Sequence, residues 1–365
     1  MDKGLSNKNT IIWLSNLGFT SKAIRNLMED MEDICEIWTM SNNDISKLSL
    51  SKKNREKILN NRKKEDLFSL LKKIRDLNVN VITIYDENYP EKLRHIPNRP
   101  KILYTKGLEL KEDFSIAIVG SRKSTNYGRW ACMKFAEELA RYRVSIISGL
   151  ALGIDAIAHG QALESGVYTI AVLGCGIDVV YPKKNEALYE KIMARGTIVT
   201  EYPLGRPPLP YNFPERNRII AGLSDGIIIV EAKDRSGTLI TANHGLEQGK
   251  DVYAVPGNIN SIFSSGTNGL IRDGAIPLLS IEDIVNENEE LKYRIQDLSS
   301  TELLDSDDFS ETEKRLLILL EEAPMHSDNI VYNLSIDIAT VNTMLVGLEL
   351  KGAVKEVANN VFMKC

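Results

Sequence analysis

The chain has 365 residues, of which 43% are hydrophobic and 26% charged, a composition typical of a globular protein with two or three domains. Lys and Arg (45) nearly balance Asp and Glu (50), and no apolar run approaches the about 18 residues that cross a membrane. The four cysteines form no CxxC pair, which argues against a zinc site and a disulfide framework and predicts a cytoplasmic protein without a metal.

Residues 1–78 predict a small all-α domain. Three stretches carry apolar residues at helical spacing: TIIWLSNLGF, SKAIRNLMEDM and the basic run REKILNNRKKEDLFSLLKKIRDL. The composition then changes at VNVITIYDENYP (79–90), where β-branched residues predict a strand and the start of a second domain.

Residues 79–288 predict a Rossmann-like core, in which a parallel sheet is covered by helices. Segments long enough for crossover helices separate six short runs rich in Val and Ile: SIAIVGS (115–121), VSIISG (144–149), YTIAVLGC (168–175), TIVTEYP (197–203), GIIIVEA (226–232) and DVYAVPG (251–257). These runs are almost free of charge until their ends, which indicates strands buried on both faces and therefore an α/β fold.

Residues 289–310 predict an acidic linker, and residues 311–365 a winged-helix-like domain. Three helical patterns, ETEKRLLILLEE, SDNIVYNL and DIATVNTMLVGLELKG, precede a hairpin that turns at Asn359–Asn360. Residues 283–365 carry 7 basic against 17 acidic side chains, so phosphate binding by the tail is not expected.

The end of the first core strand predicts a phosphate site. Ligands of doubly wound sheets bind beyond the carboxyl ends of the strands, and here the strand ends in Gly120-Ser121-Arg122 before a helix that begins near Tyr127 or Gly128. Backbone N–H groups, a hydroxyl and a guanidinium can together bind a phosphate. A glycine needed only to reverse the chain explains the same residues about equally well.

A second cluster combines aromatic rings with cations and amides. Phe213, Arg216, Asn217 and Arg218 follow Tyr211 within eight residues. Arginine and asparagine bind phosphates and base edges, and either Tyr211 or Phe213 can stack on a base. The alternative is a proline-started helix with a solvated arginine face.

Other polar segments are open to plainer interpretations. Lys183 and Lys184 form a basic loop that, taken alone, is typical of an ordinary surface. Asp155 is expected to bond to a helix start, and His159 to be a lone helical histidine. The sequence lacks G-x-G-x-x-G, Walker A and H-E-x-x-H motifs, so neither a dinucleotide cofactor nor a nucleotide-hydrolysing motor is expected.

An ordered series of motifs resembles the DprA/Smf (DNA-processing protein A) family. The series covers residues 79–282: IAIVGSR, SGLALGIDAIAHG, VLGCGIDVVYPKKN, TEYPLG, FPERNRIIAGLSDGIIIVEA, SGTLITA, AVPG and GTNGLIRDGA. The resemblance implies an extended Rossmann fold, a sterile-alpha-motif-like N-terminal domain and a winged-helix tail. It also implies a homodimer that binds single-stranded DNA without catalysis and delivers it to RecA, past single-strand-binding protein, during natural transformation.

By the same resemblance, DNA contacts are expected at Ser121, Arg122, Lys183 or Lys184, Arg216 and Arg218. The alternative is an enzyme that resembles Rossmann-like phosphoribohydrolases of nucleoside monophosphates, which SGTLITA followed by Glu247 suggests. Those enzymes carry a Gly-Gly-x-Gly-Thr pattern, which is incomplete here at Arg235-Ser236-Gly237-Thr238.

Overall fold

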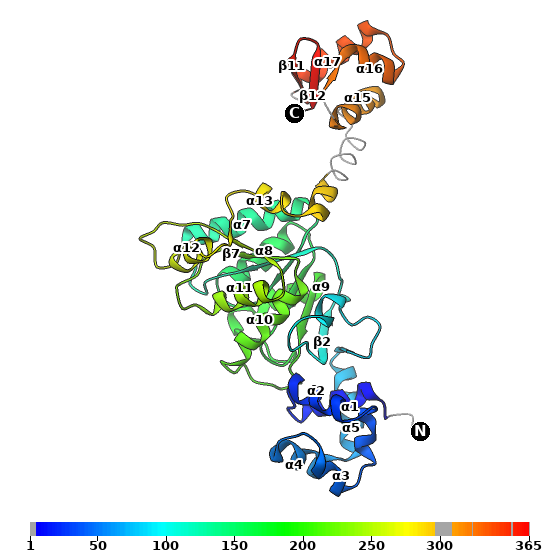
Figure 1. The fold of residues 1–365 in the computed structure, drawn as a ribbon, viewed down its shortest axis with the longest axis vertical. Helices are drawn as coiled ribbons and strands as arrows, with labels where there is room; N and C mark the ends of the chain where they lie inside the picture. Colours follow the sequence, from blue (N-terminus) through cyan, green and yellow to red (C-terminus); the bar gives the residue numbers. More distant parts are fainter. Residues whose placement is uncertain (1–4, 296–308, 323, 352, 365) are drawn as a thin grey trace. The chain divides into compact units, whose positions relative to one another are not determined.

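The computed structural model describes residues 5–295, 309–322, 324–351 and 353–364. It divides the chain into two compact units, Met1–Glu287 and Asn288–Cys365 (Figure 1).

The first unit begins with a group of short helices. Their bounds are α1 (Asn7–Asn16), α2 (Ser21–Asp30), the 3-10 helix η1 (Ile34–Trp38), α3 (Asn42–Lys47), α4 (Lys52–Asn61) and α5 (Lys64–Asp76). Ser6, Thr20, Asp33, Ser41 and Ser51 each precede a helix, and each accepts a hydrogen bond from a backbone N–H of its first turn. This capping satisfies N–H groups that lack a partner inside the helix.

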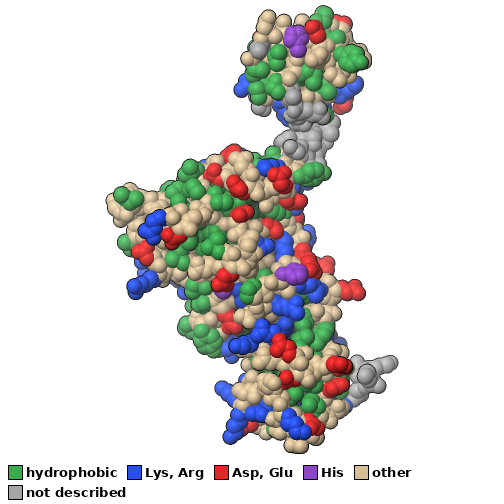
Figure 2. All heavy atoms as spheres, viewed as in Figure 1, with side chains coloured by type: hydrophobic (Ala, Val, Ile, Leu, Met, Phe, Trp, Pro, Cys, Tyr) green, Lys and Arg blue, Asp and Glu red, His purple; other side chains and the backbone are tan. Residues whose placement is uncertain are grey.

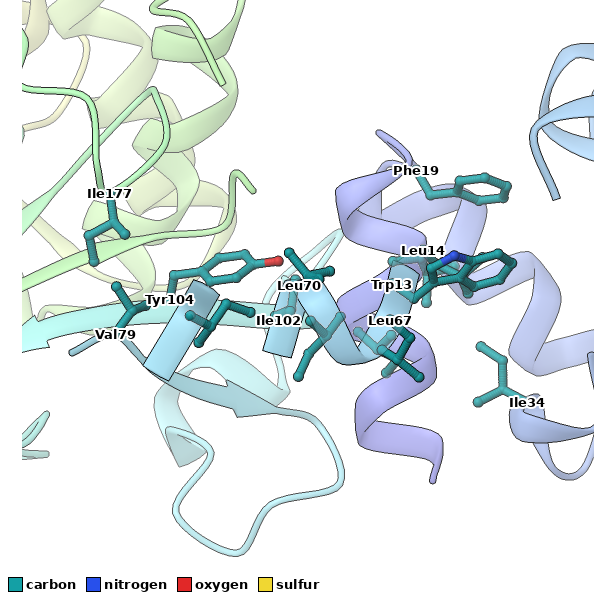
Figure 3. Close-up of a cluster of buried hydrophobic side chains, with 14 of the residues drawn as sticks. Trp13, Leu14, Phe19, Ile34, Leu67, Leu70, Val79, Ile102, Tyr104 and Ile177 are labelled. Carbon is teal, nitrogen blue, oxygen red and sulfur yellow. The ribbon is translucent and has the colours of Figure 1, made fainter. Parts of the chain in front are cut away.

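One buried apolar cluster joins these helices to the sheet. Trp13 packs on Trp38 with 4.4 Å between ring centres, and the Tyr104 hydroxyl of the sheet donates to Ser15 of α1 at 3.1 Å. Figure 3 shows Leu67 and Leu70 of α5 between the helical residues and the sheet residues Ile102 and Tyr104. The helices therefore share a core with the sheet instead of forming a separate one.

The central sheet has nine strands in the order β1-β2-β6-β5-β4-β3-β7-β8-β9. Their bounds are β1 (Asn80–Thr83), β2 (Ile102–Gly107), β3 (Ser115–Val119), β4 (Ser145–Ser148), β5 (Thr169–Val172), β6 (Thr197–Thr200), β7 (Gly226–Ile229), β8 (Asp251–Ala254) and β9 (Ile276–Pro277). Strands β3 to β9 pair in parallel, whereas β2 pairs antiparallel with β1 and β6. The predicted Rossmann-like sheet and its six core strands are confirmed; β2 and β9 were not predicted.

Helices connect most strands of this sheet, and α13 follows the last one. They are α6 (Glu91–Arg94), α7 (Asn126–Arg141), α8 (Ile154–Glu164), the 3-10 helix η2 (Lys183–Asn185), α9 (Glu186–Arg195), α10 (Asn212–Leu223), α11 (Gly237–Glu247), α12 (Ser265–Arg272) and α13 (Glu282–Val285). Helix α7 packs beside α8, and α10 beside α11. Because strand order reverses at β3, ligand access is expected beyond the carboxyl end of that strand.

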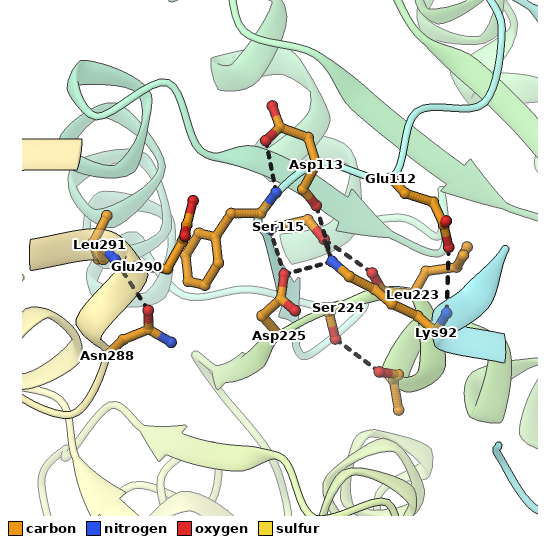
Figure 4. A network of polar contacts seen from close by, with 12 residues as sticks. Lys92, Glu112, Asp113, Ser115, Leu223, Ser224, Asp225, Asn288, Glu290 and Leu291 are labelled. Carbon is orange, nitrogen blue, oxygen red and sulfur yellow. Dashed lines mark hydrogen bonds and ion pairs between the residues drawn. The ribbon is translucent and has the colours of Figure 1, made fainter. Parts of the chain in front are cut away.

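A polar network fixes the opposite, amino-terminal end of β3 (Figure 4). The Lys92 ammonium group of α6 lies 2.6 Å from the Asp225 carboxylate, which also accepts from the Ser115 N–H at 2.9 Å. The Ser115 hydroxyl donates to the Leu223 carbonyl at 2.9 Å. The network thus ties α6 and the end of α10 to the start of β3.

The second unit contains three helices and a small sheet. Its elements are α15 (Glu311–Glu322), β10 (Met325–His326), α16 (Ser327–Leu334), α17 (Ile338–Leu350), β11 (Val354–Ala358) and β12 (Val361–Lys364), with strand order β10-β12-β11. The three predicted helices and the hairpin at Asn359–Asn360 are confirmed, with Asn360 at a φ of 57°. Residues 289–295 of the predicted linker are helical, and residues 296–308 lie outside the described residues.

Among the described helices, none alone is long and apolar enough to cross a membrane. Helices α16 and α17 meet the test of length and composition only as a pair, bent by 113°. The described residues also contain no group of three or more His, Cys, Asp or Glu side chains that could hold a metal ion.

Candidate functional site

A pocket of about 390 Å³ opens at the carboxyl end of β3. We call it the strand-end pocket; it is lined by Val119, Gly120, Ser121, Arg122, Ala151, Asp155, Pro210, Phe213, Pro214, Arg216, Asn217, Ile220, Lys233, Ser236, Gly237, Thr238 and Thr241. These residues come from the end of β3 and the loop after it, from the start of α8 and the loop before it, from α10 and the loop before it, and from the segment between β7 and the first turns of α11. The topology of the sheet thus gathers segments that are distant in sequence.

The loop after β3 is held close to its neighbours. A Cβ atom on Gly120 would lie 2.7 Å from Ile154 Cγ1, so only glycine lets α8 approach this closely. The Thr238 hydroxyl donates to the Gly120 carbonyl at 3.2 Å. Ser121 turns its hydroxyl back to the Lys123 N–H at 3.1 Å, whereas the Arg122 side chain is exposed to solvent.

Glu231, at the end of strand β7, anchors the far end of this loop. Its buried carboxylate accepts from both the backbone N–H and the hydroxyl of Thr125, the residue that caps α7. A Cβ on Gly128 would lie 2.3 Å from the Glu231 carboxyl carbon, so the carboxylate sits directly against the first turn of α7. The role of Glu231 was not predicted, although its charge, at the end of an otherwise apolar run, was a signal in the sequence.

Phe213 lies at the centre of the aromatic and cationic groups of the pocket. The guanidinium carbons of Arg122 and Arg216 lie 5.4 Å and 6.0 Å from its ring centre, and the Tyr181 ring lies 5.5 Å away. Gly174 permits this packing, because a Cβ there would lie 2.8 Å from Phe213 Cδ1. Cations at such distances are attracted to the ring face.

Arg216 is the buried cation of the pocket and only 4% of it is exposed. Its guanidinium donates to the carbonyls of Gly149 and Val172, at the ends of β4 and β5. Burial lowers the pKa of Arg216 to about 10, so the group remains charged at neutral pH. Burial raises the pKa of the Asp155 carboxyl, and the nearby positive charge of Arg216 reduces this increase.

The sequence matches two family descriptions. The family described as DNA recombination-mediator protein A matches residues 80–289, more than half of the chain. The chain belongs to this family. The second description, DprA winged helix domain, matches residues 302–360.

Individual members of the family are similar over different lengths. Protein Smf of Escherichia coli is 44% identical over 211 residues, a match that covers 57% of this chain and 56% of that relative. A crystal structure of DNA processing protein A from Streptococcus pneumoniae is 36% identical, with a TM-score of 0.68 over 77% of this chain and 98% of that one. DNA processing protein A from Helicobacter pylori, 32% identical, has a TM-score of 0.52 over 57% of this chain and 94% of that one, and its structure concerns a single-stranded DNA binding mode.

In this member of the DNA recombination-mediator protein A family, Arg218 lies outside the strand-end pocket. Only 5% of it is exposed, and its Nη2 atom donates to both carboxylate oxygens of Glu201 at 2.6 Å. The Ser21 hydroxyl of α2 donates to the same carboxylate at 3.0 Å. Arg218 therefore has a buried carboxylate in place of the phosphate that the sequence predicted, and we leave it out of the DNA contacts proposed below.

The remaining predicted residues flank the pocket or line it. Asn217 lines it and donates to the Gly237 carbonyl at 3.3 Å. Tyr211, 60% exposed, stands at the start of α10 with its hydroxyl 3.1 Å from Arg206. Lys183 and Lys184 are exposed in η2, the short helix that follows Tyr181. Tyr211 and Asn217 belong to the same stretch of chain as Phe213. The two lysines follow Tyr181, whose ring contacts Phe213.

The features that suggested an enzyme are separated in space. Residues of the SGTLITA segment line the strand-end pocket, but Glu247 lies at the far end of α11 as a partner of His244 at 3.4 Å. His159 is fully buried and bonds through Nδ1 to the Thr169 hydroxyl at 2.7 Å. Among the described residues that line the pocket, Asp155 bears the carboxylate, and it accepts from the Ala151 N–H at 3.3 Å.

Proposed function

We propose that the chain binds single-stranded DNA in the strand-end pocket, as a binding protein and not as an enzyme. The observation that carries the proposal is the Phe213 ring in the strand-end pocket, with the exposed Arg122 guanidinium 5.4 Å and the buried Arg216 guanidinium 6.0 Å from its centre. Bases stack on aromatic faces, and guanidinium groups pair with phosphates, so this arrangement suits a flexible strand with accessible bases. In a duplex the base faces already stack on each other.

The predicted contacts divide into two kinds. Arg122 and the exposed lysines Lys183 and Lys184 are proposed to bind phosphates, and Phe213, with Tyr211 beside it, to stack on bases. Ser121 and the backbone of Gly120 line the same pocket and are proposed to bind a phosphate oxygen. Asn217 is proposed to contact a base edge. Support comes from the H. pylori relative, whose structure concerns single-stranded DNA binding.

We further propose that a homodimer of this chain delivers the bound strand to RecA, past single-strand-binding protein, during natural transformation. The support is the family itself, which is described as a recombination mediator. RecA ATPase on a strand coated with single-strand-binding protein measures delivery. We expect the chain to shorten the lag in this ATPase, and an unchanged lag would contradict this part of the proposal.

Fluorescence anisotropy with labelled oligo-dT and a matched duplex tests the binding proposal. We expect the strand to bind more tightly than the duplex, and Phe213→Leu to weaken strand binding by about 1–3 kcal/mol, the usual contribution of one stacked base. Phe213→Tyr keeps the ring and is the matched control. Equal affinity for strand and duplex, or adenine released from AMP, would instead favour another function.

A further inference from the structure

A second cavity, remote in sequence from Phe213, lies between α2 and the segment that follows α6. Its volume is about 520 Å³, and we call it the basic cleft. Five cations line it against one carboxylate, Glu29: Lys22, Arg25, Arg94, Arg99 and Lys101. Figure 2 shows Lys and Arg side chains gathered on the part of the molecule where the N-terminal helices meet the sheet region.

Lys101 gives the cleft an unpaired buried charge. Only 3% of this lysine is exposed. Its backbone N–H donates to the Ser21 hydroxyl at 3.3 Å, but among the described residues no group lies within hydrogen-bond or ion-pair reach of its ammonium group. Burial, aided by Arg99 and Arg25, lowers the pKa of Lys101 to about 8, so the group is still largely protonated at pH 7.

An unpaired buried ammonium group is costly, and folded proteins normally pair such a charge. Among the residues described, the neighbouring arginines of the cleft bring no carboxylate within ion-pair reach of Lys101. The Arg25 Nε atom lies 3.7 Å from Glu29 and is itself buried without a hydrogen-bond acceptor. Arg99 donates to the Arg94 carbonyl at 2.9 Å. An anion with several acceptor oxygens would match this group of cations.

A chain of hydrogen bonds links the cleft to α10, the helix that carries several of the residues proposed to contact DNA. Ser21 at its rim donates to Glu201, and Glu201 binds Arg218 of α10. Arg218 stands two residues after Arg216, which lines the strand-end pocket. The strand-end pocket is therefore lined by α10, and the basic cleft is linked to the same helix through Ser21 and Glu201.

We propose that the basic cleft is a second anion site, which binds a phosphate group through Lys101 and the arginines around it. A phosphate offers oxygens to several donors at once, which matches this set of cations. The source that we favour is a phosphodiester of the strand held at Phe213, and this choice of source rests on the proposed function. A free phosphate or mononucleotide is the other source. The phosphate site itself does not depend on the strand-end pocket.

The test uses the full chain in the Arg122→Ala background, so that phosphate bound at the strand-end pocket does not contribute. Lys101→Met removes the ammonium group, Arg99→Ala removes an exposed guanidinium in case the first variant does not fold, and Lys52→Met on the exposed surface of α4 is the matched control. Melting temperatures are measured with inorganic phosphate and with chloride at equal ionic strength. We expect phosphate to raise the melting temperature of the background and control proteins, but not of the cleft variants.

Strand binding, measured with Arg122 intact, then identifies the source. The salt dependence of binding is the slope of log affinity against log salt concentration. If a strand reaches the cleft, Lys101→Met lowers this slope by about 0.7 for a long oligo-dT. The slope for a very short oligo-dT, which cannot reach the cleft, is unchanged. Loss of the phosphate response with unchanged oligonucleotide affinity supports the site and assigns it to a free phosphate. A phosphate response that persists in both cleft variants overturns the proposal. If the wild-type chain and all variants bind DNA weakly, but phosphate still raises the melting temperature of the Arg122→Ala chain, the proposed function is contradicted and the phosphate site is not.

Discussion

The two arginines of the strand-end pocket are predicted to have different roles, and replacing Arg216 shows this most clearly. Arg216→Met removes a guanidinium that donates to two buried carbonyls, those of Gly149 and Val172. A buried polar group left without a partner costs about 1–3 kcal/mol. Two such groups give an expected loss of about 2–6 kcal/mol, a large part of the about 5–15 kcal/mol that stabilises an ordinary domain.

Urea denaturation followed by circular dichroism measures this loss, and Arg122→Met is the matched control. Arg122 belongs to the same pocket, but its side chain is exposed. We therefore expect its replacement to change the free energy of unfolding by less than about 0.5 kcal/mol. A wild-type unfolding midpoint for Arg216→Met would refute the argument, because the two carbonyls would then not depend on this guanidinium.

Three further predictions concern pH, the tail and assembly. Burial lowers the pKa of His159 to about 3, so as the pH falls below about 6.5 the unfolded chain takes up this proton before the folded chain does. The free energy of unfolding should therefore be about 2 kcal/mol lower at pH 5 than above pH 6.5. Melting curves across this pH range should lose that dependence in His159→Gln, and an unchanged dependence would contradict it. Deleting residues 300–365 should change the Kd for oligo-dT by less than about tenfold, or about 1.4 kcal/mol, because the tail is not basic; a larger loss in a folded deletant contradicts this. Sedimentation at micromolar concentration should give twice the 40.9 kDa chain mass, and a monomer at every concentration would reject the homodimer.

The sequence predicted the parallel strands because their signal is local. Every residue of β3 is buried, as its uncharged run of Ser, Ile, Ala and Val indicated. Strand β2 was missed because its segment, KILYTKG, carries a lysine near each end and follows Pro100. It pairs antiparallel with β1 and β6, and that pairing depends on residues distant in sequence.

The site was predictable in composition but not in geometry. Residues two apart on a helix point in different directions, so Arg216 and Arg218 could not both face one pocket once α10 was a helix. That rule would have separated them from sequence alone. A charge near the end of an apolar run marked both Glu201 and Glu231 in the sequence. Their partners, Arg218 and the loop of Arg122, had no local signal, because both contacts join a strand end to an element distant in sequence.

Strand binding at the strand-end pocket is tested most directly by the salt dependence of oligo-dT affinity for the wild-type chain and for Arg122→Ala, with a melting curve for each. Arg122 is exposed, lies 5.4 Å from the Phe213 ring centre and is proposed to bind a phosphate. We predict an affinity loss of roughly 1–3 kcal/mol, a log–log slope lower by about 0.7 and an unchanged melting temperature. Unchanged affinity and slope in the folded variant would remove the loop after β3 from the DNA interface and contradict the proposed function.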